Sequence, residues 1–190
     1  TGSYLQDEYQ MPPDTVWGLV QKEYTRVALH PTNPKYEAVE PARVQANGIF
    51  DIAYKELIQE LRYNLRERED APVPVFPFAY DWRQPLENIE KQLADFVDEV
   101  IERTILLGNY AEAGYADDPK VALVGHSMGG LIITGYLESK GKNARVAKVV
   151  TLGTPYRGSF EAVLKIATGT ANLGTTEPSS REREAARLTP

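Results

Sequence analysis

One short stretch constrains the fold more than any other part of the 190-residue chain. The motif GHSMGG at residues 125–130 follows the apolar run KVALV and precedes the apolar stretch LIITGYLESK. A short continuous apolar run predicts a strand over residues 120–125 that is buried on both faces. The stretch after the motif predicts a helix over residues 128–141. The chain must therefore turn sharply from strand to helix around Ser127.

The flanking sequence predicts an alternation of helices and strands. Apolar residues at helical spacing predict helices over residues 49–65 and 85–107, each with one face on a core. Apolar runs predict short strands within residues 72–83 and over residues 144–153, and Gly141 is a plausible C-cap for the helix before it. Such alternation is typical of a parallel sheet with helices on both faces.

Three regions show no sustained hydrophobic period. Residues 1–48 are rich in Tyr, Pro and Asn and predict a long loop-rich excursion, and residues 108–119 predict a loop. Residues 168–190 are rich in Gly, Thr, Ser and Glu and predict a lid or flexible segment. The length fits one domain over residues 1–190.

Composition restricts the partners of the chain. The net charge is −6, with 21 basic and 27 acidic side chains and no basic stripe, which argues against nucleic acid. The apolar runs are far shorter than the roughly 20 residues of a transmembrane segment. Cysteine is absent and the two histidines are far apart, so we expect no disulfide, metal or cofactor. We expect a soluble chain with no visible signal peptide, and the sequence favours no compartment or oligomeric state.

The motif contains the pattern G-x-S-x-G, which is typical of a serine nucleophile at a strand-to-helix turn. The alternative is a glycine-rich turn with a passenger serine, and the flanking strand and helix favour the nucleophile. We expect a strained backbone at Ser127, with Gly125 and Gly129 allowing strand and helix to approach closely. The N–H of Met128 is then placed to face a developing oxyanion. His126 is interpreted as a packing or turn-shaping residue and not as the catalytic base.

Two further motifs sharpen this interpretation. YDWR, at residues 80–83, ends the strand before the long helix, and TLGTPYRGS, at residues 151–159, follows the last strand. With GHSMGG, their order and spacing resemble the lecithin:cholesterol acyltransferase-like, or lipase-like, branch of the α/β-hydrolase superfamily. TGSYL at residues 1–5 resembles the second half of that family's first oxyanion loop. REAARLTP at residues 183–190 resembles the text that follows the family's lid region.

The resemblance implies an α/β-hydrolase fold, a mostly parallel sheet with helices on both faces, of which this chain is an incomplete part. It implies that Ser127 is the nucleophile and Met128 an oxyanion donor. Asp81 and Arg83 are candidates for a charge pair at the site mouth, and Trp82 for contact with an acyl chain. The alternative is that YDWR only anchors a loop to the core. The full set of substrate-pocket candidates is Tyr80, Asp81, Trp82, Arg83, Thr154 and Pro155.

The catalytic base is not identified by these motifs. In this fold the chain order is Ser, then Asp or Glu, then His, and no histidine follows Ser127. His30 lies in loop text and is interpreted as an ordinary surface histidine. We expect the acid and the histidine to lie outside these residues, and favour a fragment over a separate chain or a degenerate member.

These features favour a serine-dependent lipid ester hydrolase or O-acyltransferase that works through an acyl-serine intermediate. The alternative is a non-catalytic hydrolase-like binding module or subunit that lacks a complete triad. A serine peptidase or amidase on the same fold is a third hypothesis. The expected partner is a lipid or other ester, and transient contact with a lipid surface is compatible with the sequence. Nothing in the residues decides between water and a lipid alcohol as the acyl acceptor.

Overall fold

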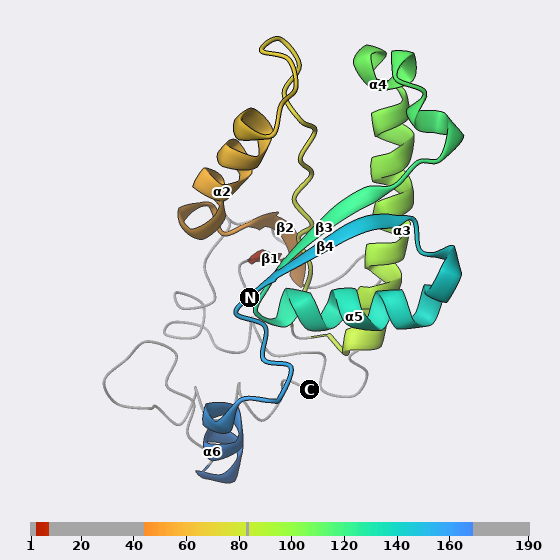
Figure 1. The fold of residues 1–190 in the computed structure, drawn as a ribbon. Helices are drawn as coiled ribbons and strands as arrows, with labels where there is room; N and C mark the ends of the chain where they lie inside the picture. Colours follow the sequence, from red (N-terminus) through yellow and green to blue (C-terminus); the bar gives the residue numbers. More distant parts are fainter. Residues whose placement is uncertain (1–2, 8–43, 83, 169–190) are drawn as a thin grey trace. The chain divides into compact units, whose positions relative to one another are not determined.

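The structure is a computed structural model that describes residues 3–7, 44–82 and 84–168 (Figure 1). It divides into two compact units. The first unit contains residues 51–78 and 89–154. The second contains residues 2–50, 79–88 and 155–190. Each unit is described by itself.

The first unit contains a parallel strand–helix–strand motif. Strands β3 (Val121–His126) and β4 (Val146–Leu152) pair in parallel, and helix α5 (Met128–Lys140) connects them through the short 3-10 helix η4 (Gly141–Asn143). The predicted helix over residues 128–141 and the predicted strands over residues 120–125 and 144–153 are therefore confirmed, with small shifts at their ends. Gly141 caps α5 at φ 52°, and its N–H donates to the Leu137 carbonyl, as expected for a C-cap.

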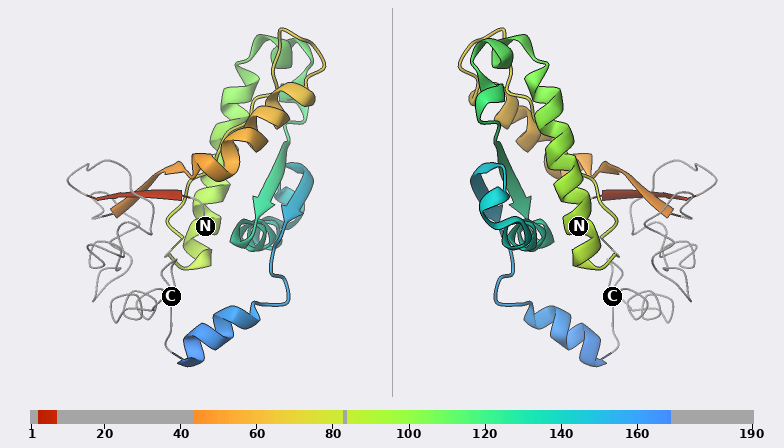
Figure 2. Two further views of the ribbon diagram at one scale, coloured as in Figure 1. Left: turned by 90° about the vertical axis from the view of Figure 1, so that its left-hand side faces the viewer. Right: turned by 90° about the vertical axis from the view of Figure 1, so that its right-hand side faces the viewer.

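Helix α3 (Leu86–Ile105) confirms the predicted long helix, and its buried side chains form much of the core. Figure 2 shows α5 nearly along its axis, beside α3 in both views. The two helices approach closely at Gly135 of α5. A Cβ at this position would lie 2.9 Å from Oε2 of Glu90 in α3. Asp98 of α3 forms an ion pair with Arg145, which precedes β4. The buried apolar residues of the first unit are Ile89, Leu93, Ala94, Val97, Ile101, Val121, Ile132, Ile133 and Tyr136.

Truncation of this core has a predictable cost. Ile132 of α5 is 1% exposed. We expect Ile132→Ala in the full-length protein to lower the free energy of unfolding by about 2–5 kcal/mol, the usual range for a buried Ile or Leu truncated to Ala. Denaturant unfolding measures this change. Glu138→Ala on the exposed side of the same helix is the control and is expected to change stability by less than about 0.5 kcal/mol. Equal effects of the two substitutions would contradict this core assignment.

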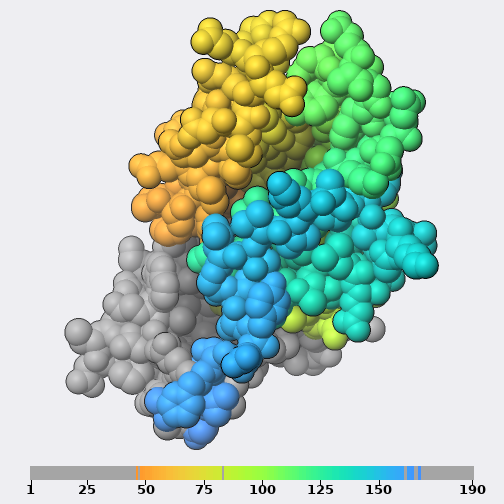
Figure 3. Space-filling model, in the orientation of Figure 1, coloured from red at the N-terminus to blue at the C-terminus, as the bar shows by residue number. Residues whose placement is uncertain are grey.

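Strand β3 is not buried on both faces, contrary to the sequence-based expectation. Val121 and Gly125 are buried, but Val124 is 41% exposed and its register partner Val150 is 42% exposed. Residues of β4 lie at the molecular surface in the space-filling view (Figure 3). Among the described residues, the strand therefore has one covered face and one exposed face. A continuous apolar run does not show whether one face or both faces of a strand are buried.

Helix α2 (Asp51–Asn64) is confirmed in position, but its expected packing face is only partly covered. None of its residues is fully buried, and Ile52 is 86% exposed. The second half of α2 is hydrogen-bonded to the segment that follows it. Arg62 accepts a backbone hydrogen bond from the Val73 N–H at 3.0 Å, and its side chain donates to the Val75 carbonyl at 2.9 Å.

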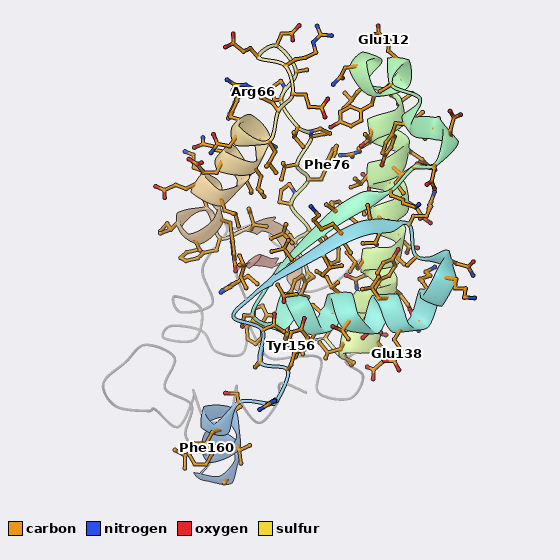
Figure 4. The ribbon with its side chains drawn as sticks, in the orientation of Figure 1. Arg66, Phe76, Glu112, Glu138, Tyr156 and Phe160 are labelled. Carbon is orange, nitrogen blue, oxygen red and sulfur yellow. The ribbon has the colours of Figure 1, made fainter. Side chains whose placement is uncertain are left out.

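The predicted strand within residues 72–83 is wrong. The described part of this segment is irregular and forms no strand; an isolated bridge joins Arg68 to Ala71 immediately before it. Three prolines within residues 72–77 remove the N–H donors that a ladder needs. The segment instead packs through aromatic side chains. The Phe78 and Phe96 rings lie 5.2 Å apart, and the Arg103 guanidinium lies 6.0 Å from the Phe76 ring centroid (Figure 4).

The predicted loop over residues 108–119 contains two short helices. They are α4 (Gly108–Glu112) and the 3-10 helix η3 (Tyr115–Asp117), joined through Gly114 at φ 72°. The rings of Tyr110 and Tyr115 meet edge to face with centroids 5.6 Å apart. This aromatic contact stabilises a compact turn that the polar composition did not reveal.

The second unit contains strands β1 (Ser3–Asp7) and β2 (Val44–Ile49), which pair antiparallel, and helix α6 (Phe160–Thr168). Strand β1 and most of β2 lie within residues 1–48, which were predicted to be rich in loops. Residues 8–43 and the expected lid at 169–190 lie outside the described residues. Among the helices that are described, none combines the length and apolar character of a membrane span.

Candidate active site

The backbone at Ser127 is strained. Ser127 lies between the last residue of β3 and the first of α5, with φ 53° and ψ −124°. Of the non-glycine residues that the structure describes, it is the one with a positive φ. A non-glycine residue in such a region costs about 1–3 kcal/mol and persists where surrounding contacts enforce it, often at functional sites. The expected strain at Ser127 is therefore present.

Two backbone hydrogen bonds hold this turn. The Ser127 N–H donates to the Leu152 carbonyl at the end of β4, at 2.8 Å. The Gly130 N–H donates to the Ser127 carbonyl at 3.1 Å. Ser127 is thus fixed both to the neighbouring strand and to the first turn of its own helix.

The Ser127 side chain does not act as an ordinary helix cap. A capping serine has an extended backbone, and its hydroxyl accepts from an N–H of the first helical turn. Ser127 has a positive φ, and its side chain makes no capping hydrogen bond in the described structure. Its hydroxyl is therefore not committed to the helix that follows.

Met128 is the first residue of α5. The first N–H groups of a helix have no carbonyl partner within it, and the helix dipole makes this end electropositive. An oxyanion that forms on a carbonyl attacked by Ser127 would develop beside this end. The geometry therefore places backbone N–H donors next to the Ser127 hydroxyl. Acyl transfer requires both a nucleophile and such donors.

Of the two glycines expected to let strand and helix approach closely, Gly125 makes the close approach and Gly129 does not. A Cβ at Gly125 would lie 2.8 Å from Ile133 Cδ1 and 2.9 Å from the Gly130 nitrogen, so strand and helix do meet closely there. A Cβ at Gly129 would have no neighbour within 4 Å, which corrects its expected role in this approach. The second crowded position is Gly130, where a Cβ would lie 2.7 Å from Thr154 Cγ2.

Thr154 lies just after β4 and packs against the start of α5. Its Oγ1 is buried and has no hydrogen-bond partner among the described residues. Sequence analysis placed Thr154 beside the substrate. The structure brings it to the first turn of α5 at Gly130, in the same unit as Ser127.

His126 has a partner that the sequence did not suggest. Its Nδ1 lies 2.9 Å from the hydroxyl of Tyr54 in α2, and the two rings meet edge to face with centroids 5.8 Å apart. Partial burial raises the pKa of the Tyr54 phenol above its usual range. The assignment of His126 as a packing or turn-shaping residue and not the base stays a prediction.

The YDWR residues and Pro155 belong to the second unit. Asp81 is buried, and its carbonyl accepts a hydrogen bond from the Gln84 N–H at 3.0 Å, while Tyr80 and Trp82 are half-buried. Arg83 lies outside the described residues, so its expected charge pair with Asp81 is not tested. Pro155 is half-buried and accepts a hydrogen bond from the Gly158 N–H at 2.9 Å, in a turn. Tyr156, which follows it, is 56% exposed (Figure 4), as expected for a loop position.

Metal-ligating side chains do not cluster in the described part of the chain: no three His, Cys, Asp or Glu residues lie close enough to hold an ion. At the elbow, the described polar groups are the side chains of Ser127, His126 and Tyr54 and the backbone N–H groups at the start of α5.

Sequence analysis missed two residues of this site. Gly130 was quoted in the motif, but its role was given to Gly129, because the pattern G-x-S-x-G assigns the last glycine without showing where Thr154 lies. Tyr54 carried no signal, since it is 72 residues from His126 and sits among ordinary helix formers. Only the fold brings these two side chains together.

Comparison with protein families identifies the chain. The family model for lecithin:cholesterol acyltransferase matches residues 37–188, most of its length. Comparisons with curated proteins and with solved structures gave no match. The family implies an α/β-hydrolase-like fold and acyltransferase or hydrolase activity on lipids, and the parallel β3–β4 pair with its connecting helix is consistent with that fold. The chain belongs to the lecithin:cholesterol acyltransferase family.

Proposed function

We propose that the protein is a serine-dependent lipid ester hydrolase or O-acyltransferase and that Ser127 is its nucleophile. The observation that carries this proposal is the strained turn at Ser127, φ 53°, between a parallel strand and the electropositive start of α5. Family membership supports lipid acyl chemistry, and the elbow supports a serine as the group that performs it.

The proposed reaction has two halves. The Ser127 Oγ attacks the ester carbonyl carbon while a base takes the hydroxyl proton, and the carbonyl π electrons move to oxygen. The Met128 N–H donates to this oxyanion, an interaction worth about 3–4 kcal/mol in comparable sites. The carbonyl then re-forms, and the alcohol leaves with the proton that the base returns. Water or a second alcohol attacks the acyl-serine in the same way and frees Ser127.

The proposal requires a histidine base and an acid from outside these 190 residues. The chain holds two histidines, His30 and His126, and neither follows Ser127 as the chain order of α/β-hydrolases demands. His126 is held by Tyr54 through Nδ1. A catalytic imidazole also uses both ring nitrogens, one towards the serine and one towards the acid that orients it.

We further propose that the first unit is part of a complete α/β-hydrolase domain. At the end of β3, Gly125 faces α5, and alternation along a strand turns the next side chain, His126, to the opposite face. Tyr54 of α2 meets His126 on that face. Helices on both faces of a parallel sheet are the arrangement that supports this fold. In the second unit, Tyr80, Asp81 and Trp82 remain candidates for substrate contact.

Covalent labelling tests the proposed nucleophile. We expect the full-length protein to react with a fluorophosphonate to give one adduct in its intact mass, and peptide mapping to place that adduct on Ser127. Fluorophosphonates react with serines that a neighbouring base activates, so the same result shows that a base is present. A panel of lipid esters with and without added alcohol then distinguishes hydrolysis from acyl transfer.

Two results would contradict the proposal. The absence of an adduct on folded full-length protein would favour the alternative of a non-catalytic hydrolase-like binding module. An adduct on another serine would keep the enzyme class but reject Ser127. Ser139, which also lies in α5, serves as an internal comparison, because its hydroxyl donates to the Tyr136 carbonyl at 2.9 Å. No label is expected there.

A further inference from the structure

The residue before the nucleophile is anchored by a side chain from a distant helix. Tyr54 lies in the first turn of α2, and its hydroxyl is 2.9 Å from His126 Nδ1. The rings meet edge to face, with an interplanar angle of 64°. A directional hydrogen bond and a ring contact together restrict both the position and the rotation of the imidazole.

This anchor acts on a side chain at the end of the β3–β4 ladder, where His126 is in register with Leu152. On its C-terminal side, the turn is held by the hydrogen bond from Gly130 to the Ser127 carbonyl. The Ser127 N–H is held by Leu152. His126 ends β3 and is an exposed residue, so packing alone does not immobilise its side chain. Its hydrogen bond to Tyr54 restrains this side chain in addition to the strand pairing of its backbone.

The strained conformation of Ser127 explains why such a restraint matters. A residue at φ 53° relaxes towards a lower-energy conformation unless its neighbours oppose the movement. Rotation of the peptide between His126 and Ser127 would move both the Ser127 Oγ and the Met128 N–H. Misplacement of reacting groups by about 1 Å can cost about 100-fold in rate.

We propose that Tyr54 is a positioning residue for the nucleophile, acting through its hydrogen bond to His126. The proposal rests on the proposed function of Ser127. It adds a contact from α2 that restrains the residue before the nucleophile. In the proposed contact the Tyr54 hydroxyl donates and His126 Nδ1 accepts, which requires the ring tautomer with its proton on Nε2. Since burial raises the pKa of the phenol, the donor stays protonated through neutral and mildly alkaline pH.

The test removes one oxygen atom. In the full-length protein, Tyr54→Phe keeps the ring contact and deletes the hydrogen bond. We expect kcat for ester cleavage and the rate of fluorophosphonate labelling to fall about three- to tenfold, the range for loss of one neutral hydrogen bond. KM is expected to stay within about twofold, because the contact acts on the nucleophile and not on bound substrate.

Matched variants separate positioning from general stability. Tyr63→Phe in the same helix is the control and is expected to retain full activity, because Tyr63 is 50% exposed and its contact with Arg66 is made by the ring. His126→Leu should reproduce the Tyr54→Phe defect. His126→Asn, which keeps an acceptor near the Nδ1 position, should retain at least about half of the activity. Thermal unfolding of each variant identifies any loss of fold.

The double variant decides whether Tyr54 acts through His126. Tyr54→Phe in the His126→Leu background should cause no further loss of kcat, because the hydrogen bond is already absent. Additive losses would overturn the proposal, as would wild-type kcat in Tyr54→Phe or a rise in KM without a fall in kcat. If wild-type protein is not labelled at all, the proposed function fails, and the positioning role fails with it. If it is labelled and Tyr54→Phe is unchanged, only the positioning role fails.

Discussion

Ser127→Ala is expected to lower kcat for ester cleavage in the full-length protein by about a million-fold, the loss seen when a serine hydrolase loses its nucleophile. The backbone donors at the start of α5 remain, so a small residual rate above the uncatalysed reaction is expected. Alanine keeps a Cβ at φ 53°, so the backbone strain is unchanged and the variant should fold as the wild type does. Initial rates at saturating substrate, with circular dichroism as a check of fold, measure this effect.

Ser127→Gly sharpens the same experiment. Glycine also lacks the hydroxyl, so the variant should be as inactive as Ser127→Ala. It has no Cβ, so it adopts a positive φ without steric cost, and its unfolding free energy should exceed that of Ser127→Ala by about 1 kcal/mol. Ser139→Ala on the same helix is the control and should retain wild-type activity. Activity of Ser127→Ala above about 1% of wild type would mean that another group is the nucleophile.

The regular elements near the elbow were predictable because their signals are local. The run KVALV, the apolar stretch after the motif and Gly141 after Lys140 gave β3 and α5 to within about a residue. The apolar residues at helical spacing over residues 85–107 predicted the position of α3 and most of its buried face. Local backbone preference and hydrophobic period are read over a window of neighbours, which is all that a single sequence offers.

The errors arose where longer-range contacts decide the outcome. Residues 72–78 have the side chains of a strand but also prolines, and they pack through Phe76 and Phe78 on α3. Val124 lies in an apolar run that predicted burial, yet it is 41% exposed, and its register partner Val150 is 42% exposed. The Tyr54 contact could not have been predicted, because nothing in the spacing of two residues 72 apart shows that they meet.

Gly130→Ala is expected to damage the elbow while leaving Ser127 in place. Its Cβ would lie 2.7 Å from Thr154 Cγ2 and 2.8 Å from Thr154 Cβ, distances that no relaxed structure tolerates. Either the start of α5 or the residue after β4 must move. Overpacking of this kind costs about 1–3 kcal/mol of stability. Movement of the first turn of α5 also displaces the Met128 N–H, so we expect kcat to fall about 100-fold.

A compensating substitution identifies the cause of that loss. Thr154→Gly removes the three atoms nearest to the new Cβ, and it breaks no hydrogen bond of Oγ1 within the described residues. Adding it to Gly130→Ala should therefore recover at least about tenfold in kcat, although Thr154→Gly alone lowers stability through added chain entropy. Gly129→Ala is the matched control for stability: its Cβ meets nothing within 4 Å and alanine lowers the entropy of the unfolded chain, so its unfolding midpoint should be at least that of the wild type. If Thr154→Gly gives no recovery, the contact between Gly130 and Thr154 does not set the position of the oxyanion donor. Recovery would show that the residue after β4 fixes the helix start on which the proposed chemistry depends.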